Sequence, residues 1–473
     1  MTLEQFYLMR HEILLVFVAL VLLIAELSYG NAHKHKIIYW GLSLFFLITV
    51  IGFCPVPEGS LFGGMYQSTP LVVLMKNILN IGVFIILLQS VAYLKQDDIK
   101  EKISEFFILL ISTLIGMNFM ISSGDFLMFY IGLELATLPL ASLAAYDRYK
   151  EKSAEAGIKL ILSSALSSGI LLYGLSMIYG TTGSIYFTDI ALNYGNTSLQ
   201  ALAFIFFFTG MAFKISLVPF HLWTADVYEG SPTPVTSYLS VISKGAAAFI
   251  FTIVLYTVFN SIAFLWKDLI YVIAIVTMTI ANLFAIRQQN LKRFLAFSSI
   301  AQAGFILLGV IGGSQLGMTT VIYFVLIYIF SNLGAFGVIN AISVKTGKEN
   351  MDDYDGLYRT NPKLSLAMML SLFSLAGIPP VAGFFGKFFL FTAAAEQGLF
   401  ILVLIAVINT IISLYYYLLV IKAMFLNRSD NPIANFKSHW TTKASLIICM
   451  LGIAVTGFAS ILFEYIRNLS FGF

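Results

Sequence analysis

The chain alternates between long apolar runs and short polar connections. Fourteen runs stand out, at 13–30, 37–54, 72–94, 106–121, 125–146, 157–179, 198–223, 231–257, 268–286, 293–311, 319–344, 364–396, 400–425 and 443–466. About 20 apolar residues in a helix cross the hydrocarbon core of a bilayer. Apolar side chains do not alternate with polar ones here, as the strands of a membrane barrel require. The pattern predicts an all-α polytopic membrane protein with about 14 transmembrane helices.

The connections leave no room for a second, soluble domain. The longest polar ones cover 345–363 and 427–442, so we expect a single integral membrane domain over 1–473. Hydrophobic residues make up 59% of the chain and charged residues 11%, against about 25% charged in soluble domains. The mean hydropathy is +0.90, which excludes a soluble enzyme. The first twelve residues lack a basic region and a cleavage site, so the first run is expected to be a retained span.

Lysine and arginine gather on one face of the predicted bundle. Of 27 such residues, eighteen lie in the connections that follow odd-numbered runs, and only Arg10, Lys267 and Arg467 lie on the opposite face. Basic loops face the cytoplasm in membrane proteins. We therefore expect both termini outside, in the periplasm if the membrane is a bacterial cell inner membrane, which we favour.

Six lysines fall inside the apolar runs: Lys76, Lys159, Lys214, Lys244, Lys387 and Lys422. Lys76 and Lys422 lie near run ends, where their amines can reach the polar interface. Lys159 lies near the basic end of its run, and both interpretations stay open for it. A lysine at the centre of a span costs about 2.5–3.5 kcal/mol on insertion scales. The remaining three lysines are therefore candidates for function.

Prolines interrupt two of the runs that carry these lysines. Pro219 follows Lys214, and the pair Pro379 and Pro380 precedes Lys387. Proline cannot donate a backbone hydrogen bond and clashes with the preceding turn, so each helix must break or kink there. The two runs are five apart in the series and cross the membrane in opposite directions. This predicts two inverted five-helix repeats, as in many transporters, at 106–257 and 268–425, flanked by helices at 13–94 and 443–466.

Glu134 is the one carboxylate deep in a run, and it needs protonation or a partner there. We expect Lys214 to be that partner. The pair would keep the amine charged, and its separation would favour release of the proton. Lys214, Lys244 and Lys387 would then form a proton relay, joined by water, His221, Ser243, Ser299 and Gln302.

Structural alternatives remain for each of these residues. The buried charges could serve only to hold helices together. His221 could bond the carbonyls that Pro219 frees instead of transferring protons. Asp226 and Glu229, in the turn before the run at 231–257, could be no more than a helix-start charge and a solvated loop residue.

The chain has no motif for a nucleotide or a redox centre. It contains no Walker lysine motif, no GxGxxG opening a helix and no cysteine cluster. Cys54 and Cys449 lie in apolar sequence far apart, so we expect small core residues and no metal site. The energy that moves protons must then come from a partner.

Four segments resemble the antiporter-like membrane subunits of complex I, NADH:quinone oxidoreductase. They are FKISLVPFHLWTADVYEGSPTPVT with SKGAAAF, EAGIKLILSSALSSGILLYGLSMIYGTTGS, LKRFLAFSSIAQAGFILLG and GIPPVAGFFGKF. The resemblance covers essentially the whole chain. It implies fourteen spans, two inverted repeats and a proton channel with Glu134, Lys214, Lys244 and Lys387, and Lys159 as a connecting lysine.

The resemblance also implies partners and cofactors. FMN, iron–sulfur clusters and quinone would be bound by other complex I subunits and none by this chain. Its contacts would be neighbouring membrane-arm subunits and lipid, with no nucleic acid. The family often has histidine where this chain has Gln302, which cannot titrate and could only hold water. Lys387 and the DVYEG turn favour the branch with lysine, not glutamate, in span twelve. A third branch of the family has a long lateral helix after span fourteen, and the end of this chain at Phe473 disfavours that branch.

The expected function is therefore that of a proton-translocating membrane-arm subunit, working with electron transfer from NADH to quinone in its partners. A subunit of a multi-subunit cation/proton antiporter or of a hydrogenase-linked ion pump is the first alternative. A purely structural spacer is the second.

Overall fold

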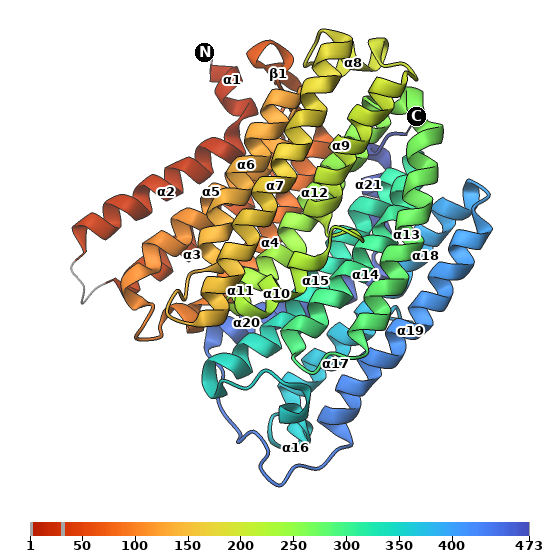
Figure 1. The fold of residues 1–473 in the computed structure, drawn as a ribbon. Helices are drawn as coiled ribbons and strands as arrows, with labels where there is room; N and C mark the ends of the chain where they lie inside the picture. The colour runs from red at the N-terminus through yellow and green to blue at the C-terminus, as the bar shows by residue number, and fades with distance from the viewer. Residues whose placement is uncertain (1–2, 30–33, 473) are drawn as a thin grey trace.

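The computed structural model describes residues 3–29 and 34–472, which form a bundle of tilted helices (Figure 1). The first half contains α1 (Leu3–Leu8), α2 (Arg10–Ser28), α3 (His35–Gly52), α4 (Pro70–Leu94), α5 (Ile103–Ile121), α6 (Phe126–Ala144), α7 (Glu151–Thr182), α8 (Phe187–Asn193), α9 (Ser198–Ile215), α10 (Leu222–Gly230), α11 (Thr233–Tyr238) and α12 (Lys244–Thr257). The second half contains α13 (Ala263–Ala285), α14 (Leu291–Ile311), α15 (Gln315–Thr346), α16 (Leu357–Thr360), α17 (Pro362–Ala376), α18 (Ala382–Glu396), α19 (Phe400–Phe425), α20 (Trp440–Phe458) and α21 (Ser460–Leu469).

The prediction of an all-α polytopic membrane protein is confirmed. Within the described residues, 13 helices are long and apolar enough to cross a membrane. The run at 364–396 is divided into α17 and α18, so the break predicted from Pro379 and Pro380 is confirmed. The predicted last span, 443–466, is wrong in one respect: its helix ends at Phe458 and a second helix, α21, follows. A small hairpin, β1 (Gly59–Leu61) with β2 (Tyr66–Ser68), closes one end, Gly59 pairing with Ser68.

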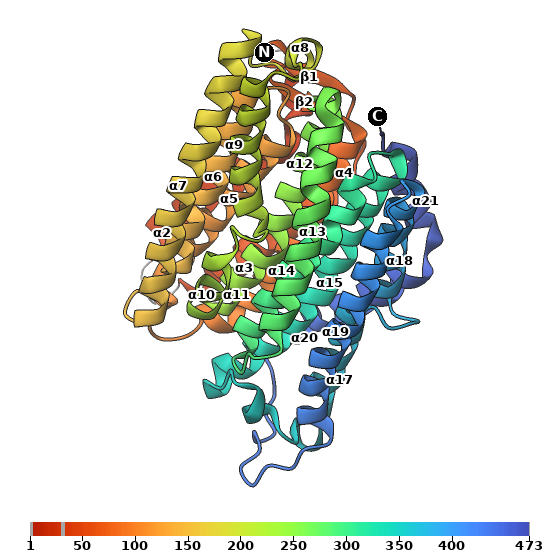
Figure 2. The same ribbon diagram turned by 45° about the vertical axis from the view of Figure 1, so that its right-hand side comes forward.

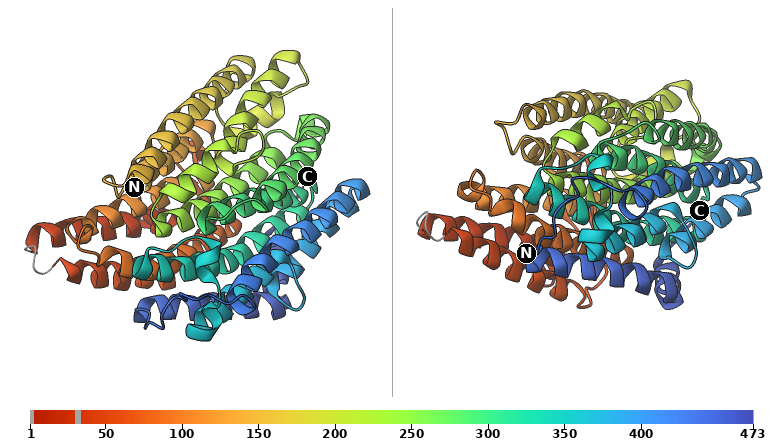
Figure 3. Two further views of the ribbon diagram at one scale, coloured as in Figure 1. Left: turned by 60° about the horizontal axis from the view of Figure 1, so that its bottom comes forward. Right: turned by 90° about the horizontal axis from the view of Figure 1, so that it is seen from below.

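The most enclosed helices are α14 and α15, at the centre of the bundle in Figures 1 and 2. In the most apolar stretch of each, every residue is buried, whereas α2 and α19 bury about a third. The outer helices therefore turn apolar side chains outward, as lipid contact requires. α20 packs on α4, so the C-terminal part of the chain, blue in Figure 3, lies against the N-terminal part, red to orange.

Small residues bring α5 and α6 into close contact. A Cβ on Gly116 would lie 2.3 Å from the backbone nitrogen of Ala136, and one on Gly132 would lie 2.5 Å from that of Met120. Membrane helices often pack through such residues, since backbones can then approach. The contact holds α6, which carries Glu134, in a defined position.

Two helices are interrupted where the prolines lie. α9 ends at Ile215, one residue after Lys214, and Ser216 takes a left-handed conformation with φ of 66°. Pro219 lies in the gap before α10 begins at Leu222. Pro379 and Pro380 lie in the gap between α17 and α18. A third irregularity, the π-helical turn η4 (Leu239–Ser243), directly precedes Lys244, and such turns are frequent at functional sites.

A buried row of lysines as the candidate functional site

Three buried lysines, Lys214, Lys244 and Lys387, form the candidate site, and we call them the lysine row. Lys214 lies in the last turn of α9. Its side chain is buried, and its Nζ donates a 2.7 Å hydrogen bond to the Thr137 hydroxyl of α6. Two small cavities border Lys214. One is lined by Ser164, Ser167 and Ser168 of α7 and the other by Ser243 of η4. Serine side chains of two different elements thus line the space next to Lys214.

The predicted ion pair between Glu134 and Lys214 does not form in this structure. Lys214 contacts Thr137 instead, which lies three residues after Glu134 on α6. The Oε1 atom of Glu134 is buried and has no hydrogen-bond partner among the described residues. Because residues three apart share a helix face, the hydroxyl takes the place that the sequence assigned to the carboxylate.

Lys244 is the second member, on α12 at the end of the π-helical turn. Its Nζ donates a 2.7 Å hydrogen bond to the Ser299 hydroxyl of α14. The amine also lies 5.4 Å from the ring centre of Tyr228. Such a position over an aromatic face attracts a cation. Lys244 is therefore held by a hydroxyl and a ring.

Polar groups of α14 continue the row toward α17. The Ser298 and Tyr417 hydroxyls lie 2.5 Å apart. The Gln302 amide donates to the Tyr417 hydroxyl at 3.3 Å and to the Leu375 carbonyl at 3.0 Å. Its Oε1 atom is buried without a partner, so Gln302 joins α14 to the end of α17.

Lys387, on α18, is the third member. Its Nζ donates a 3.1 Å hydrogen bond to the carbonyl of Ala376, the last residue of α17. The amine lies 4.5 Å from the ring centre of Phe305. The last carbonyls of a helix have no partner within it, so the break in the helix creates the acceptor. The carbonyls of Leu375 and Ala376 are adjacent and link Gln302 to Lys387.

His221 lies in the gap before α10 and is buried, with no hydrogen-bond partner at Nδ1. Among the described residues no hydrogen bond joins its ring to Lys214 or Lys244. The structure thus places it beside the row but does not connect it.

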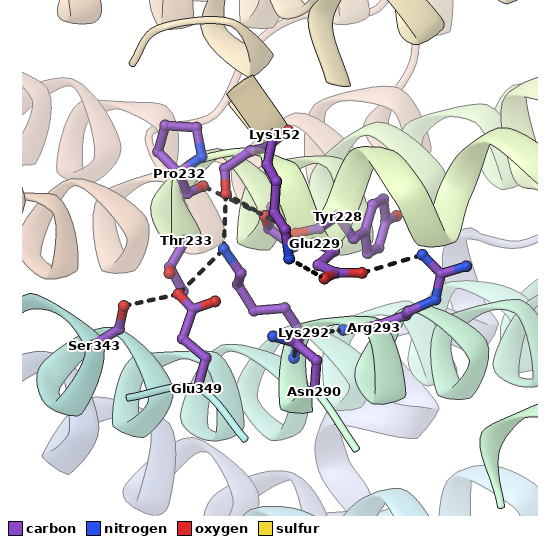
Figure 4. A network of polar contacts seen from close by, with 12 residues as sticks. Lys152, Tyr228, Glu229, Pro232, Thr233, Asn290, Lys292, Arg293, Ser343 and Glu349 are labelled. Carbon is purple, nitrogen blue, oxygen red and sulfur yellow. Dashed lines mark hydrogen bonds and ion pairs between the residues drawn. The ribbon is translucent and has the colours of Figure 1, made fainter. Parts of the chain in front are cut away.

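Charged side chains form a second group at the basic face, which we call the basic-face cluster; Figure 4 shows the part around Glu229 and Lys292. The ion pairs join Lys152 to Glu229 at 2.8 Å, Arg293 to Glu229 at 3.1 Å, Arg293 to Asp226 at 2.6 Å, Lys159 to Asp226 at 2.5 Å and to Glu155 at 2.6 Å, and Lys292 to Glu349 at 3.2 Å. The Lys292 amine also donates to the Ser231 carbonyl at 3.1 Å. The cluster ties α10 to α7 and α14.

Asp226 stays charged within this cluster. Burial raises the pKa of its carboxyl, but hydrogen bonds from Lys159 and Arg293 outweigh that effect and lower the pKa below its ordinary value. Lys159 itself is 40% exposed. Asp226 and Lys159 therefore lie together at the edge of the bundle and outside the buried row.

A buried ion pair at the other end of the bundle was missed in the sequence. Lys76 is 1% exposed, and its Nζ lies 2.6 Å from Glu12 and 2.8 Å from the Tyr66 hydroxyl. The expectation that Lys76 reaches the interface was wrong, because α2 and the hairpin cover it. The sequence feature that could have indicated this ion pair is the polar triplet Arg10–His11–Glu12 beside the first apolar run. Lys422 is exposed, as expected.

The two cysteines differ in their surroundings. Cys449 is buried, but Cys54 is exposed, which corrects the expectation of a core position. Cys54 lies just beyond the end of α3 at Gly52, where the chain leaves the bundle. No group of three or more metal-binding side chains occurs in residues 3–29 and 34–472.

Comparison with known proteins identifies the family. Residues 123–413 match the family described as NADH:quinone oxidoreductase/Mrp antiporter, TM. NADH-quinone oxidoreductase subunit N of Phocaeicola vulgatus is 55% identical over 412 residues, which are 87% of each chain. Subunit N of Azobacteroides pseudotrichonymphae is 53% identical, over 88% of this chain and 87% of that protein.

Solved structures agree. A chain of respiratory complex I from Thermus thermophilus superposes with a TM-score of 0.78 and 26% identity, over 96% of this chain and 98% of that one. A chain of the Mrp complex from Dietzia sp. has a TM-score of 0.84 at 21% identity, over 99% and 97%, a likeness of fold. The chain thus belongs to the membrane subunits of the NADH:quinone oxidoreductase and Mrp antiporter family. Within that family it falls in the subunit N group of NADH-quinone oxidoreductase.

Proposed function

We propose that Lys214, Lys244 and Lys387 carry protons through the interior of this chain, with Glu134 controlling the first of them. The chain is a proton-translocating membrane subunit of NADH:quinone oxidoreductase, part of respiratory complex I. The observation that carries the proposal is that α14 holds both the Ser299 hydroxyl, which accepts from Lys244, and the Gln302 amide, which donates to the Leu375 carbonyl next to the Ala376 carbonyl that accepts from Lys387.

The partners of these lysines support a relay more than a structural role. The hydrogen bonds of the three amines go to two hydroxyls and a carbonyl. In the described residues no carboxylate lies within ion-pair distance of any of them. Lys76, by contrast, has a carboxylate at 2.6 Å. A buried amine without a counter-charge can lose its proton at low cost, because desolvation disfavours the charged form.

Glu134 would act as the switch. Its unpartnered Oε1 and its three-residue offset from Thr137 leave room for the Lys214 amine to change partner. Movement onto the carboxylate would hold the proton, and return to the hydroxyl would release it toward Lys244. Ser243, which lines the cavity beside Lys214, immediately precedes Lys244.

Supporting roles follow from position. Lys159 and Asp226 would hold α10 at the basic face, and His221 would hold water beside the break at Pro219. Gln302 would keep the end of α17 against α14 through its hydrogen bonds. The two broken helices would mark two inverted repeats, 106–257 and 268–425.

The energy for the switch would come from partner subunits. FMN, iron–sulfur clusters and quinone would be bound there, and the neighbouring membrane-arm subunits would pass on a conformational or electrostatic change. We place the chain in a bacterial inner membrane with both termini in the periplasm.

An antiporter subunit that works without any oxidoreductase is the alternative from another class. Co-purification of the chain with flavin and iron–sulfur subunits distinguishes complex I from it. A complex that purifies without them and exchanges cations for protons would overturn our assignment.

The relay is tested by Lys214→Ala in inverted membrane vesicles, with NADH oxidation and quinone-coupled proton pumping followed together. We expect both activities to fall about tenfold or more, because positioned proton-transfer groups typically contribute factors of that size or larger. Lys422→Ala is the matched control, since Lys422 is an exposed lysine of an apolar run. Normal pumping by an assembled Lys214→Ala complex would refute the relay.

A further inference from the structure

A trough of about 620 Å³ lies between α17 and α20, away from the lysine row. Its walls are apolar and are formed by Leu364, Ala367, Leu446, Ile447, Met450 and Leu451. From Lys443 to Leu451 the wall follows nine residues of α20, which rise by roughly 12 Å along the helix. The trough is therefore long enough to hold part of a hydrocarbon chain.

Three lysines surround one end of the trough: Lys363, Lys437 and Lys443. All three are exposed, and within the described residues none makes an ion pair. Among the described residues, no acidic side chain lines the trough. Both helices also begin at this end, α17 at Pro362 and α20 at Trp440, and helix N-termini carry partial positive charge. Positive charge thus accumulates there without a counter-charge from the described part of the chain.

The mouth of the trough is held in shape by Asn361, which is buried. Its amide donates to the carbonyls of Ile433 at 3.4 Å and Ala434 at 3.2 Å, and its oxygen accepts from the Phe436 nitrogen at 3.3 Å. Phe436 lines the trough. The connection after α19, seen at the lower end of Figure 2, is thereby fixed over the charged end.

The trough has the orientation that a phospholipid requires. Its charged end lies among the connections of the basic face, and its apolar end runs into the helices. Trp440 is 58% exposed beside the lysines, and tryptophan is enriched at the level of lipid headgroups. Basic pockets between membrane helices on the cytoplasmic side suit anionic headgroups.

We propose that this trough binds one anionic phospholipid, its phosphate between Lys363, Lys437 and Lys443 and an acyl chain along α20. The lipid would brace α17, whose last carbonyl accepts the hydrogen bond from Lys387. Neither the trough nor its lysines are part of the proposed relay.

The test uses the purified whole complex in detergent micelles with trace photoactivatable lipid. Phosphatidylglycerol and phosphatidylcholine carry the same diazirine acyl chain, and mass spectrometry locates the label. Peptides of α17 and α20 should be labelled several times more by the anionic lipid. The triple variant Lys363→Gln/Lys437→Gln/Lys443→Gln should reduce the anionic labelling about fivefold or more, since each lysine attracts anionic lipid appreciably. Lys36→Gln/Lys345→Gln/Lys348→Gln removes three charges from the same face and should not.

Two outcomes overturn the proposal. Equal labelling of wild type by the two lipids would show an apolar trough without headgroup selectivity, and this comparison needs no variant to fold. If neither lipid labels the peptides of α17 and α20 and these peptides are instead found crosslinked to another subunit, protein covers the trough.

Discussion

Buried lysines of two kinds occur in this chain, and their nearest neighbours separate them. Lys76 has a carboxylate and a phenol within hydrogen-bond distance. Lys214, Lys244 and Lys387 have hydroxyls, aromatic rings and a carbonyl. A fully paired charge is a fixed structural element, whereas an amine with neutral partners can change its protonation without leaving an opposite charge buried.

Lys76→Met should destabilise the subunit by about 3–5 kcal/mol, because Glu12 would remain as an unpaired buried charge. We expect a lower melting temperature and less assembled complex in membranes. Glu12→Gln/Lys76→Met removes both charges and should recover most of the loss. If the single variant assembles and melts like wild type, Glu12 is not held as a charged partner of Lys76.

At the scale of single helices, each interruption frees backbone carbonyl groups that can accept hydrogen bonds from side chains. The end of α17 supplies the carbonyls of Leu375 and Ala376, and α18 begins close enough for the Gly383 nitrogen to donate to Ser374 at 3.1 Å. A Cβ on Gly383 would lie 1.7 Å from the Ser374 carbonyl oxygen. Only glycine permits this contact between the two halves of the broken helix.

Gly383→Ala should therefore separate α17 from α18 and displace Lys387 from Ala376. Overpacking of this kind costs about 1–3 kcal/mol or more, so the complex should melt at lower temperature and pump less. Gly180→Ala in α7 is the control, because a Cβ added there would meet nothing within 4 Å and alanine favours helix. Equal proton pumping by the two variants would contradict the idea that the close contact between α17 and α18 at Gly383 is needed for function.

Charge asymmetry predicts the orientation of the whole molecule in the membrane. The connections with eighteen of the 27 lysines and arginines lie on one face, and the basic-face cluster and the lipid trough belong to that face. We expect it to be cytoplasmic.

Thiol labelling can test this orientation. In a Cys54→Ser background, which removes the exposed native thiol, Asn196→Cys should react with a membrane-impermeant maleimide in spheroplasts. Asn431→Cys should react only in inverted vesicles, because its loop follows the thirteenth run. Both positions are exposed. The reverse labelling pattern would place the basic loops outside.

The amino-acid sequence by itself determined the helical membrane class, most of the spans, the two interrupted helices and the lysines inside the runs. Each of these depends on local chemistry: apolar length, proline geometry and the cost of a charge in lipid. Which groups touch was decided only by the packing of the helices. Thr137 takes the Lys214 amine in place of Glu134, Lys76 is covered by α2, and Cys54 is exposed. Such contacts join residues far apart in the chain, so they depend on helix rotation and depth, which a periodic pattern does not specify.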